Sequence, residues 1–164
     1  MDKKKVTAFI LLDLAKAFDS VRHSILLHKL YCVGASLDTV KWFSSYLSGR
    51  SQSVRIRCSA SSPLPITHGV PHGAVLSPLL FCIYMNDLPL VTQSYDMASF
   101  VDDSKVYLSF TNDYIDQATQ NLEADLVRVA KWCSENQLLI NPDKTKFLYI
   151  DNRQLMRNLS TDMT

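Results

Sequence analysis

Three acidic side chains have the type and spacing to bind a divalent cation. Asp13 ends an otherwise apolar run, Val6–Leu12, and Asp102 and Asp103 lie between two further apolar runs in ASFVDDSKVYLSF (98–110). A carboxylate at the end of a buried strand is costly unless a partner or a metal compensates for its lost hydration. If the strand before Asp13 lies beside a hairpin carrying Asp102 and Asp103, up to three carboxylates converge on one sheet edge.

Clustered carboxylates repel one another, and either protonation or a bound divalent cation relieves the repulsion. Oxygen ligands without neighbouring His or Cys suit Mg²⁺. Two such ions about 4 Å apart would activate a hydroxyl and stabilise a leaving phosphate oxygen in an in-line displacement. The alternatives are that Asp13 terminates its strand in solvent and that Asp102-Asp103 is the polar turn of a hairpin.

A second unusual stretch is HGVPHGAVLSP (68–78), which contains two glycines and two prolines. Such residues fix a backbone that a ligand can approach closely, and the N-terminus of a following helix attracts phosphate. His68 and His72 lie four residues apart, but Gly69 and Pro71 between them preclude a helical pair of metal ligands. With no third ligand evident, zinc is not expected there.

The elements that must position these residues follow from apolar periodicity and capping signals. Helices are predicted at 23–31, from the Ser36 cap to Gly49, at 78–88 and at 115–133. Strands are predicted at 6–12, at 53–58 with Val54 and Ile56 facing inward, and at 147–150, with a hairpin at 98–110. Helices packed on one face of a mainly antiparallel sheet make an α+β fold.

Composition is that of one globular domain, with 164 residues of which 47% are hydrophobic. A net charge of +1 gives no sign of a general nucleic-acid binder, although it leaves room for a local basic surface. The four cysteines lie far apart without a C-x-x-C pair, which argues against a zinc site or a disulfide framework. We expect all four in the core, in a reducing compartment: Cys32, Cys58, Cys82 and Cys133.

Apolar runs in the chain have the length of strands, so no membrane span is predicted. The start, MDKKKVTAFILLDLAKAFD, is superficially like a signal peptide. However, Asp13, Lys16 and Asp19 interrupt the region where such a peptide needs its apolar body and cleavage site. A cytoplasmic or nuclear location is therefore expected.

Four motifs, in order, closely resemble the palm domain of reverse transcriptases from non-LTR (LINE-type) retrotransposons. They are FILLDLAKAFDSV, HGVPHGAVLSPLLFCIYMNDL, FVDD and WCSENQLLINPDKTKFL, and the likeness runs from Val6 to Ile150. The resemblance implies a polymerase palm and an RNA-directed DNA polymerase activity. In that reaction a primer 3′-hydroxyl attacks a dNTP, guided by an RNA or DNA template, with two Mg²⁺ ions as cofactor and Mn²⁺ as the alternative.

The resemblance also implies a role for each residue that matches a motif. Asp13, Asp102 and Asp103 match the catalytic aspartates that bind the metal ions, and the backbone carbonyl of Leu14 lies where the family also ligates metal. Lys144 looks like the basic residue that helps to protonate or neutralise the pyrophosphate leaving group. A lone lysine after a turn is otherwise a solvated side chain.

Nucleotide-binding residues are implied in the first two motifs. Phe18 matches the bulky side chain that blocks a 2′-hydroxyl and so selects deoxynucleotides; the alternative is an aromatic core residue. Pro71, His72 and Gly73 match the loop that packs on the incoming nucleotide and template. Asp19, although adjacent to the first motif, is expected to be structural.

The second motif departs from the family pattern at three positions. His68 and His72 stand where the family usually has glutamine, and Ser77 stands where glycine is common, which is expected to stiffen the loop. Histidine still donates a hydrogen bond, but its shape and protonation state differ from those of glutamine.

The resemblance predicts a partial palm domain over 1–150 and a truncated tail, 151–164, without an assigned element. The fingers motifs before Val6, the primer grip and thumb, and an endonuclease are expected in a longer element rather than in this chain. One alternative is a degenerate or repurposed palm fragment that at most binds nucleic acid or a partner. Another is an unrelated metal-dependent phosphohydrolase, which would leave the other motifs unexplained.

Overall fold

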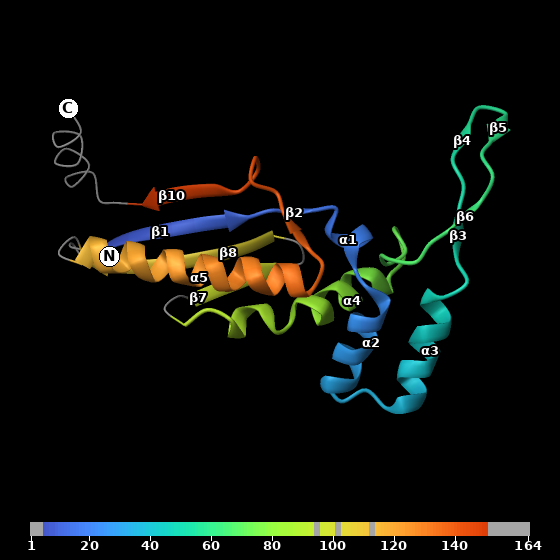
Figure 1. The fold of residues 1–164 in the computed structure, drawn as a ribbon, viewed down its shortest axis with the longest axis horizontal. Coiled ribbons are helices and arrows are strands. Elements are labelled where there is room, and N and C mark those ends of the chain that lie inside the picture. The colour runs from blue at the N-terminus through green and yellow to red at the C-terminus, as the bar shows by residue number, and fades with distance from the viewer. Residues whose placement is uncertain (1–4, 94–95, 101–102, 112–113, 151–164) are drawn as a thin grey trace. The chain divides into compact units, whose positions relative to one another are not determined.

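The computed structural model describes residues 5–93, 96–100, 103–111 and 114–150. The chain divides into two compact units, whose elements are labelled in Figure 1. Unit 1 comprises Met1–Ala15, Asp87–Cys133 and Ile140–Thr164, and unit 2 comprises Lys16–Asn86 and Ser134–Leu139. The predicted tail, 151–164, lies outside the described residues, and the predicted palm boundary at residue 150 stays a prediction.

Unit 1 is built on a four-stranded antiparallel sheet in the order β10-β1-β8-β7. The strand bounds are β1 Lys5–Leu12, β7 Asp96–Phe100, β8 Asp103–Thr111 and β10 Lys146–Ile150. These strands confirm the predicted first and last strands and the predicted hairpin. They also confirm an α+β fold with an antiparallel sheet.

β1 lies inside the sheet, with β10 and β8 hydrogen-bonded to its two edges. Ala8, Ile10 and Leu12 alternate along one face and are buried, whereas Thr7 and Leu11 on the other face are half-buried. The strand is therefore more deeply buried on one face than on the other. A continuous apolar run has no period from which the more buried face can be identified.

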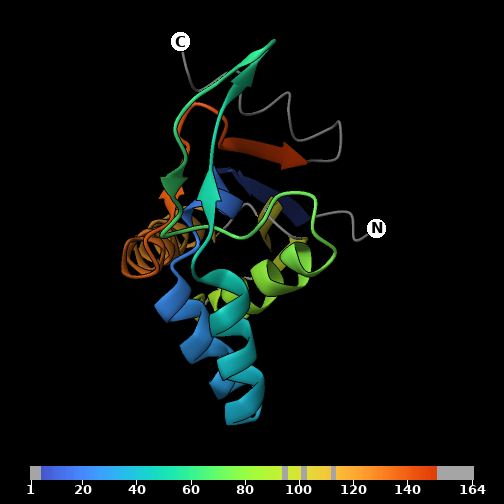
Figure 2. The same cartoon turned by 90° about the vertical axis from the view of Figure 1, so that its right-hand side faces the viewer.

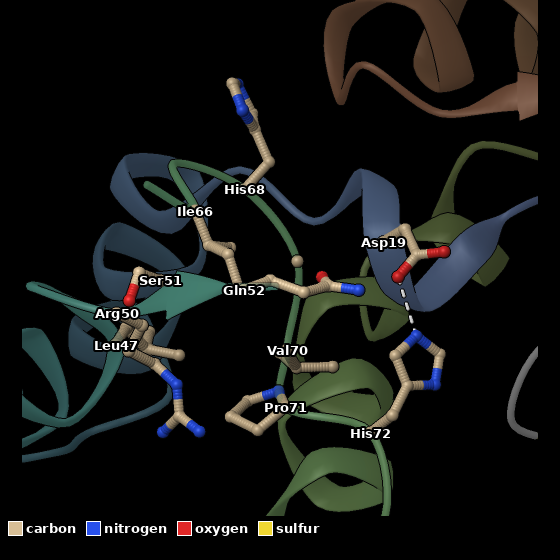
Figure 3. A pocket seen from close by; sticks show the side chains of 11 residues that line it. Asp19, Leu47, Arg50, Ser51, Gln52, Ile66, His68, Val70, Pro71 and His72 are labelled. Carbon is tan, nitrogen blue, oxygen red and sulfur yellow. Dashed lines mark hydrogen bonds and ion pairs between the residues drawn. The ribbon is translucent and has the colours of Figure 1, made fainter. Parts of the chain in front are cut away.

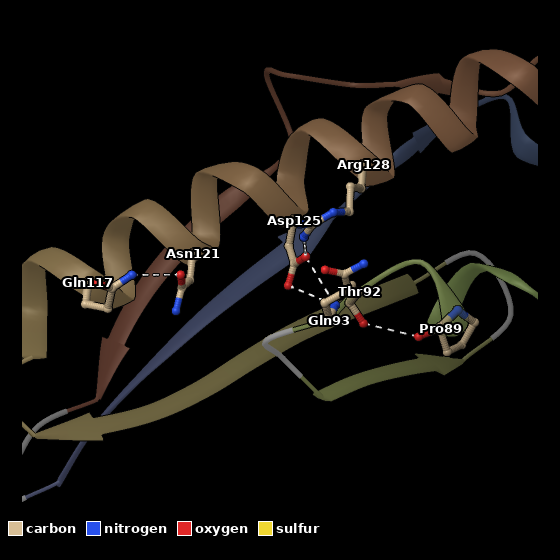
Figure 4. A network of polar contacts seen from close by, with 7 residues as sticks. All are labelled: Pro89, Thr92, Gln93, Gln117, Asn121, Asp125 and Arg128. Carbon is tan, nitrogen blue, oxygen red and sulfur yellow. Dashed lines mark hydrogen bonds and ion pairs between the residues drawn. The ribbon is translucent and has the colours of Figure 1, made fainter.

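The helix α5 (Ile115–Glu135) runs alongside this sheet, as Figures 1 and 4 show. Its predicted apolar stripe is confirmed, since Ala118, Val129 and Cys133 are buried. Asp125 is also buried, with an exposed fraction of 1%. Its carboxylate pairs with the Arg128 guanidinium and accepts the Gln93 backbone N–H at 3.2 Å (Figure 4).

Unit 2 contains four helices in its described residues: α1 Ala17–Ser20, α2 His23–Cys32, α3 Leu37–Leu47 and α4 Leu76–Met85. Ser36 caps α3 as predicted, because its side chain accepts the Thr39 backbone N–H at 3.2 Å. Gly49 follows the helix with φ +68°, in the left-handed region that glycine adopts without strain.

α4 places Pro78 in its first turn as predicted, but it ends at Met85 rather than Leu88. A short 3₁₀ helix, η1 (Leu88–Leu90), follows. Pro89 explains the break, since it has no N–H to donate to the Met85 carbonyl and disfavours helical backbone in the residue before it.

Tyr84 is the largest fully buried side chain of unit 2. Its hydroxyl donates to the Asn136 carbonyl at 2.6 Å, and the Lys29 ammonium donates to the Tyr84 carbonyl at 2.6 Å. These bonds attach Ser134–Leu139 to the helices of unit 2. The surrounding apolar core includes Val21, Leu26, Leu30, Leu47, Leu80 and Phe81.

An arm follows α3 (Figure 2): β3 (Ser51–Gln52) pairs with β6 (Leu64–Pro65), and β4 (Arg55–Ile56) pairs with β5 (Ser59–Ala60). The prediction that Val54 and Ile56 face inward was wrong, because their exposed fractions are 58% and 70%. Alternation indicates a strand, but it does not show whether another layer covers the apolar side.

Two shorter strands, β2 (Leu14–Ala15) and β9 (Leu139–Ile140), were not predicted. The prediction of four core cysteines was wrong for three, because only Cys133 is buried whereas Cys32, Cys58 and Cys82 are exposed. No helix among the described residues has both the length and the apolar character to cross a membrane.

Candidate active site

Pairing of β1 with β8 brings two of the predicted aspartates to the same end of the sheet. The ladder places Leu12 opposite Ser104. Asp13 is the next residue after Leu12, and Asp103 is the residue before Ser104. Extending the antiparallel register by one residue therefore sets Asp13 opposite Asp103. The adjacency of strand and hairpin, which the sequence left as a condition, is confirmed.

The β10 side of β1 brings Lys144 to this end as well. Leu11 lies opposite Lys146, the first residue of β10, so the turn that precedes β10 and contains Lys144 lies at the same end of the sheet as Asp13. The turn that contains Lys144 is attached here, because the Asn141 N–H donates to the Asp13 carbonyl at 2.8 Å. We call this end of the sheet, with Asp13, Asp103 and Lys144, the carboxylate edge.

The other predicted metal ligands are less well defined. Phe100 pairs with Asp103, so Val101 and Asp102 join β7 to β8, and both lie outside the described residues. The predicted convergence of the Asp13 and Asp102 carboxylates therefore stays a prediction. Leu14, whose carbonyl is a predicted ligand, is buried directly after Asp13.

The donor set at the carboxylate edge suits a hard divalent cation. Asp13 is half-buried, and a carboxylate with reduced hydration gains from a nearby positive charge. Within the described ranges, no group of three or more His, Cys, Asp or Glu side chains is arranged to hold a metal. Asp102 lies outside these ranges.

In unit 2, two of the predicted nucleotide-binding residues come together although they belong to different motifs. The rings of Phe18 and His72 lie 6.2 Å apart between centroids. Phe18 is half-buried and stacks on Phe81, with centroids 4.8 Å apart. Phe18 can therefore both pack in the aromatic core and face a nucleotide, since one part of the residue is covered and another remains accessible.

His72 also contacts the carboxylate of Asp19, with 2.6 Å between Nε2 and Oδ1 (Figure 3). Both side chains are exposed. Asp19 was expected to be structural, and its contact with His72 gives it a specific role in fixing the imidazole ring. No sequence signal links the two residues, which lie 53 positions apart.

The loop before His72 is attached by its backbone to the first motif. The Gly69 N–H donates to the Val21 carbonyl at 2.7 Å, and the Val70 N–H donates to the Phe18 carbonyl at 2.9 Å. Gly69 has φ +86°, and a Cβ there would lie 3.0 Å from the Asp19 Cα. Glycine is required here by both conformation and close approach.

Beyond His72, the predicted stiffening of the loop by serine has a structural basis. The Ser77 hydroxyl is buried and donates to the Pro71 carbonyl at 2.5 Å. Gly73, between them in sequence, has φ +76° and open space around it. The loop therefore has a fixed backbone on both sides of an exposed His72.

A cavity of about 510 Å³ opens beside this loop within unit 2. Figure 3 shows its lining side chains, among which Asp19, Arg50, His68 and His72 supply polar groups. Leu47, Ile66, Val70 and Pro71 add apolar side chains to the lining, so the cavity suits a ligand with both polar and apolar parts.

Comparisons with known proteins agree with these motifs. A family model described as reverse transcriptase (RNA-dependent DNA polymerase) matches residues 1–161. A probable RNA-directed DNA polymerase from transposon BS of Drosophila melanogaster is 32% identical over 155 residues, covering 88% of this chain and 16% of the relative. The RNA-directed DNA polymerase from mobile element jockey of the same fly is 29% identical over 168 residues, covering 93% of this chain and 17% of the relative.

Among solved structures, telomerase from Candida tropicalis matches with a TM-score of 0.63 at 12% identity, covering 90% of this chain and 26% of that chain. This likeness supports the fold. The chain thus spans about a sixth of the length of the curated relatives described above, since it covers 16% and 17% of them.

Proposed function

Because the chain belongs to the reverse transcriptase (RNA-dependent DNA polymerase) family, we propose that it supplies the catalytic centre of an RNA-directed DNA polymerase of a LINE-type element. The reaction is the attack of a primer 3′-hydroxyl on a dNTP opposite a template base. The observation that supports the proposal is the strand order β10-β1-β8, in which β1, the strand that ends before Asp13, lies between the strand that begins at Asp103 and the strand that follows the Lys144 turn.

At the carboxylate edge, Asp13, Asp102 and Asp103 would hold Mg²⁺, with the Leu14 carbonyl as a further oxygen ligand. A bound divalent cation supplies charge stabilisation for the attacking and leaving oxygens. Lys144, exposed in its turn, has the reach and charge to neutralise the pyrophosphate as it leaves, and its ammonium is a proton source.

In unit 2, Phe18, Pro71, His72 and Gly73 would position the incoming nucleotide. The stacking of Phe18 on Phe81 restricts the ring, which makes it a firm obstacle to a 2′-hydroxyl. Asp19 holds the imidazole of His72, so that the ring can present its other nitrogen and its face to the nucleotide or template.

The test is primer extension on poly(rA)/oligo(dT) by the full-length element that carries this chain. Asp102→Asn keeps the side-chain shape and removes the charge, and it should lower extension by at least about 100-fold. Asp38→Asn is the matched control, since Asp38 is 93% exposed on α3 and should leave extension unchanged. Normal extension by Asp102→Asn would refute the metal assignment.

A further inference from the structure

One side of α3 carries a ladder of flat side chains spaced by one helical turn. The rings of Trp42 and Tyr46 are stacked, with centroids 5.5 Å apart and planes 5° from parallel. The Arg50 guanidinium lies over the Tyr46 ring, 5.6 Å from its centroid. Phe43 meets both rings edge-on. We call Trp42, Tyr46 and Arg50 the α3 face.

This ladder is accessible to a ligand. Trp42 has an exposed fraction of 55%, Arg50 is exposed and Tyr46 is half-buried. The core-facing side of the same helix is formed by residues such as Leu47, which is 1% exposed. Although Trp42 stacks on Tyr46, much of its indole remains in water, where apolar area is unfavourable, so the α3 face is a candidate binding surface.

The charge around the α3 face is mainly positive. Between Thr39 and Asn86 the sequence contains no Asp or Glu, whereas Lys41, Arg50, Arg55 and Arg57 all fall there. The whole chain has a net charge of only +1, so these four cations are a local excess. All four are exposed. Lys41 is partly offset by Asp38, 3.4 Å away.

The aromatic and basic parts form one continuous segment of unit 2. α3 leads directly into the arm (51–65), as Figure 2 shows, and Arg50 immediately precedes the arm in the sequence. Arg55 lies on β4, and Arg57 lies in the turn of the β4–β5 hairpin with φ +54°. The arm therefore extends the positive charge away from the stacked rings.

We propose that the α3 face and the arm bind single-stranded nucleic acid, with unpaired bases stacking on Trp42 and the arm arginines contacting phosphates. Flat aromatic groups beside cations are the stacking platforms of single-strand binders, and a local excess of cations attracts a polyanion. The phosphates of a duplex could also contact the arginines, but its paired bases have no free faces to stack on Trp42. The surface uses none of the proposed catalytic residues, so the inference goes beyond the polymerase reaction.

The two tryptophans of the chain make a direct test, because Trp42 is exposed and Trp132 is buried. Titrating the chain with an oligouridylate of about 16 nucleotides, without divalent cation, should quench tryptophan emission as bases stack on Trp42. In Trp42→Leu the remaining emission, from Trp132, should not respond. Inorganic polyphosphate, which has charge but no bases, should compete for binding without quenching.

Affinities of variants are measured by the anisotropy of the labelled oligouridylate. Trp42→Leu and Tyr46→Leu should each weaken binding by about 5-fold or more. Tyr114→Leu is the matched control, because Tyr114 is a 66% exposed aromatic residue of unit 1, and its affinity should equal that of the wild type. Arg55→Gln and Arg57→Gln should each reduce the slope of log affinity against log salt by about 1.

Unchanged emission at saturating oligouridylate, or wild-type affinity of Trp42→Leu, would overturn the proposal. So would equally tight binding of a blunt duplex of the same length. The outcome is separable from that of the polymerase test, because Asp102→Asn should retain single-strand binding in full even where primer extension is lost.

Discussion

Gly69 is the position where one added methyl group should disturb the candidate site most directly. A Cβ there would lie 3.0 Å from the Asp19 Cα and 3.1 Å from the Asp19 and Phe18 carbonyl oxygens. These are backbone atoms, so no side-chain rotation can relieve the contact. The φ of +86° adds conformational strain for any L-residue with a Cβ.

The two effects of Gly69→Ala can be given magnitudes. Left-handed backbone costs about 1–2 kcal/mol for a residue with a Cβ, and overpacking adds about 1–3 kcal/mol. The expected loss of unfolding free energy is thus about 2–5 kcal/mol. Gly49→Ala is the matched control, because Gly49 has φ +68° with nothing within 4 Å, and it should cost only about 1–2 kcal/mol.

Urea unfolding followed by circular dichroism measures both losses. Amide hydrogen exchange gives a local measurement, since the Gly69 and Val70 N–H groups donate to Val21 and Phe18 in the native structure. Exchange at both should accelerate in Gly69→Ala and stay slow in Gly49→Ala. Equal destabilisation by the two variants would show that the close approach at Gly69 has no energetic consequence.

Two further predictions concern other buried groups. Asp125→Asn removes the charge that pairs with Arg128, so it should lower the unfolding free energy, measured in urea, by about 1–3 kcal/mol. The control is Glu123→Gln, on the exposed side of α5. An equal loss of unfolding free energy in both variants would contradict the prediction. Burial raises the pKa of Cys133 to about 11, so its thiolate fraction at about pH 8 is far lower than that of an ordinary cysteine. An aromatic disulfide reagent should therefore modify the three exposed cysteines of the native chain rapidly and Cys133 only after unfolding, and simultaneous reaction of all four would refute the assignment.

The elements that could be predicted from the sequence are those with a local cause. The Ser36 cap, the alternation in β7–β8 and the long stripe of α5 each have a physical basis within one segment. The prediction that Val54 and Ile56 face inward was wrong because inward burial depends on a covering layer from elsewhere in the chain. The prediction of buried cysteines was wrong for three of the four for the same reason.

The candidate site shows the same division. Motif residues could be identified one by one, but the register that sets Asp13 opposite Asp103 depends on strands that are far apart in sequence. The contact between Asp19 and His72 likewise joins two motifs, and neither residue type alone predicts it. The structural reason for Gly69 becomes visible only when the Phe18–Val21 backbone lies against it.

The division of the chain into units has a consequence for biosynthesis. Lys16–Asn86 is one uninterrupted stretch, whereas unit 1 draws on three separate stretches. A ribosome therefore releases the α2, α3 and α4 helices together, well before β8 has been translated. β1 precedes all of unit 2 along the chain, whereas its partner β10 follows all of unit 2. The apolar β1 must therefore wait until all of the intervening elements have been translated before both of its edges are hydrogen-bonded, so the strand that leads to Asp13 depends on protection from aggregation in the nascent chain.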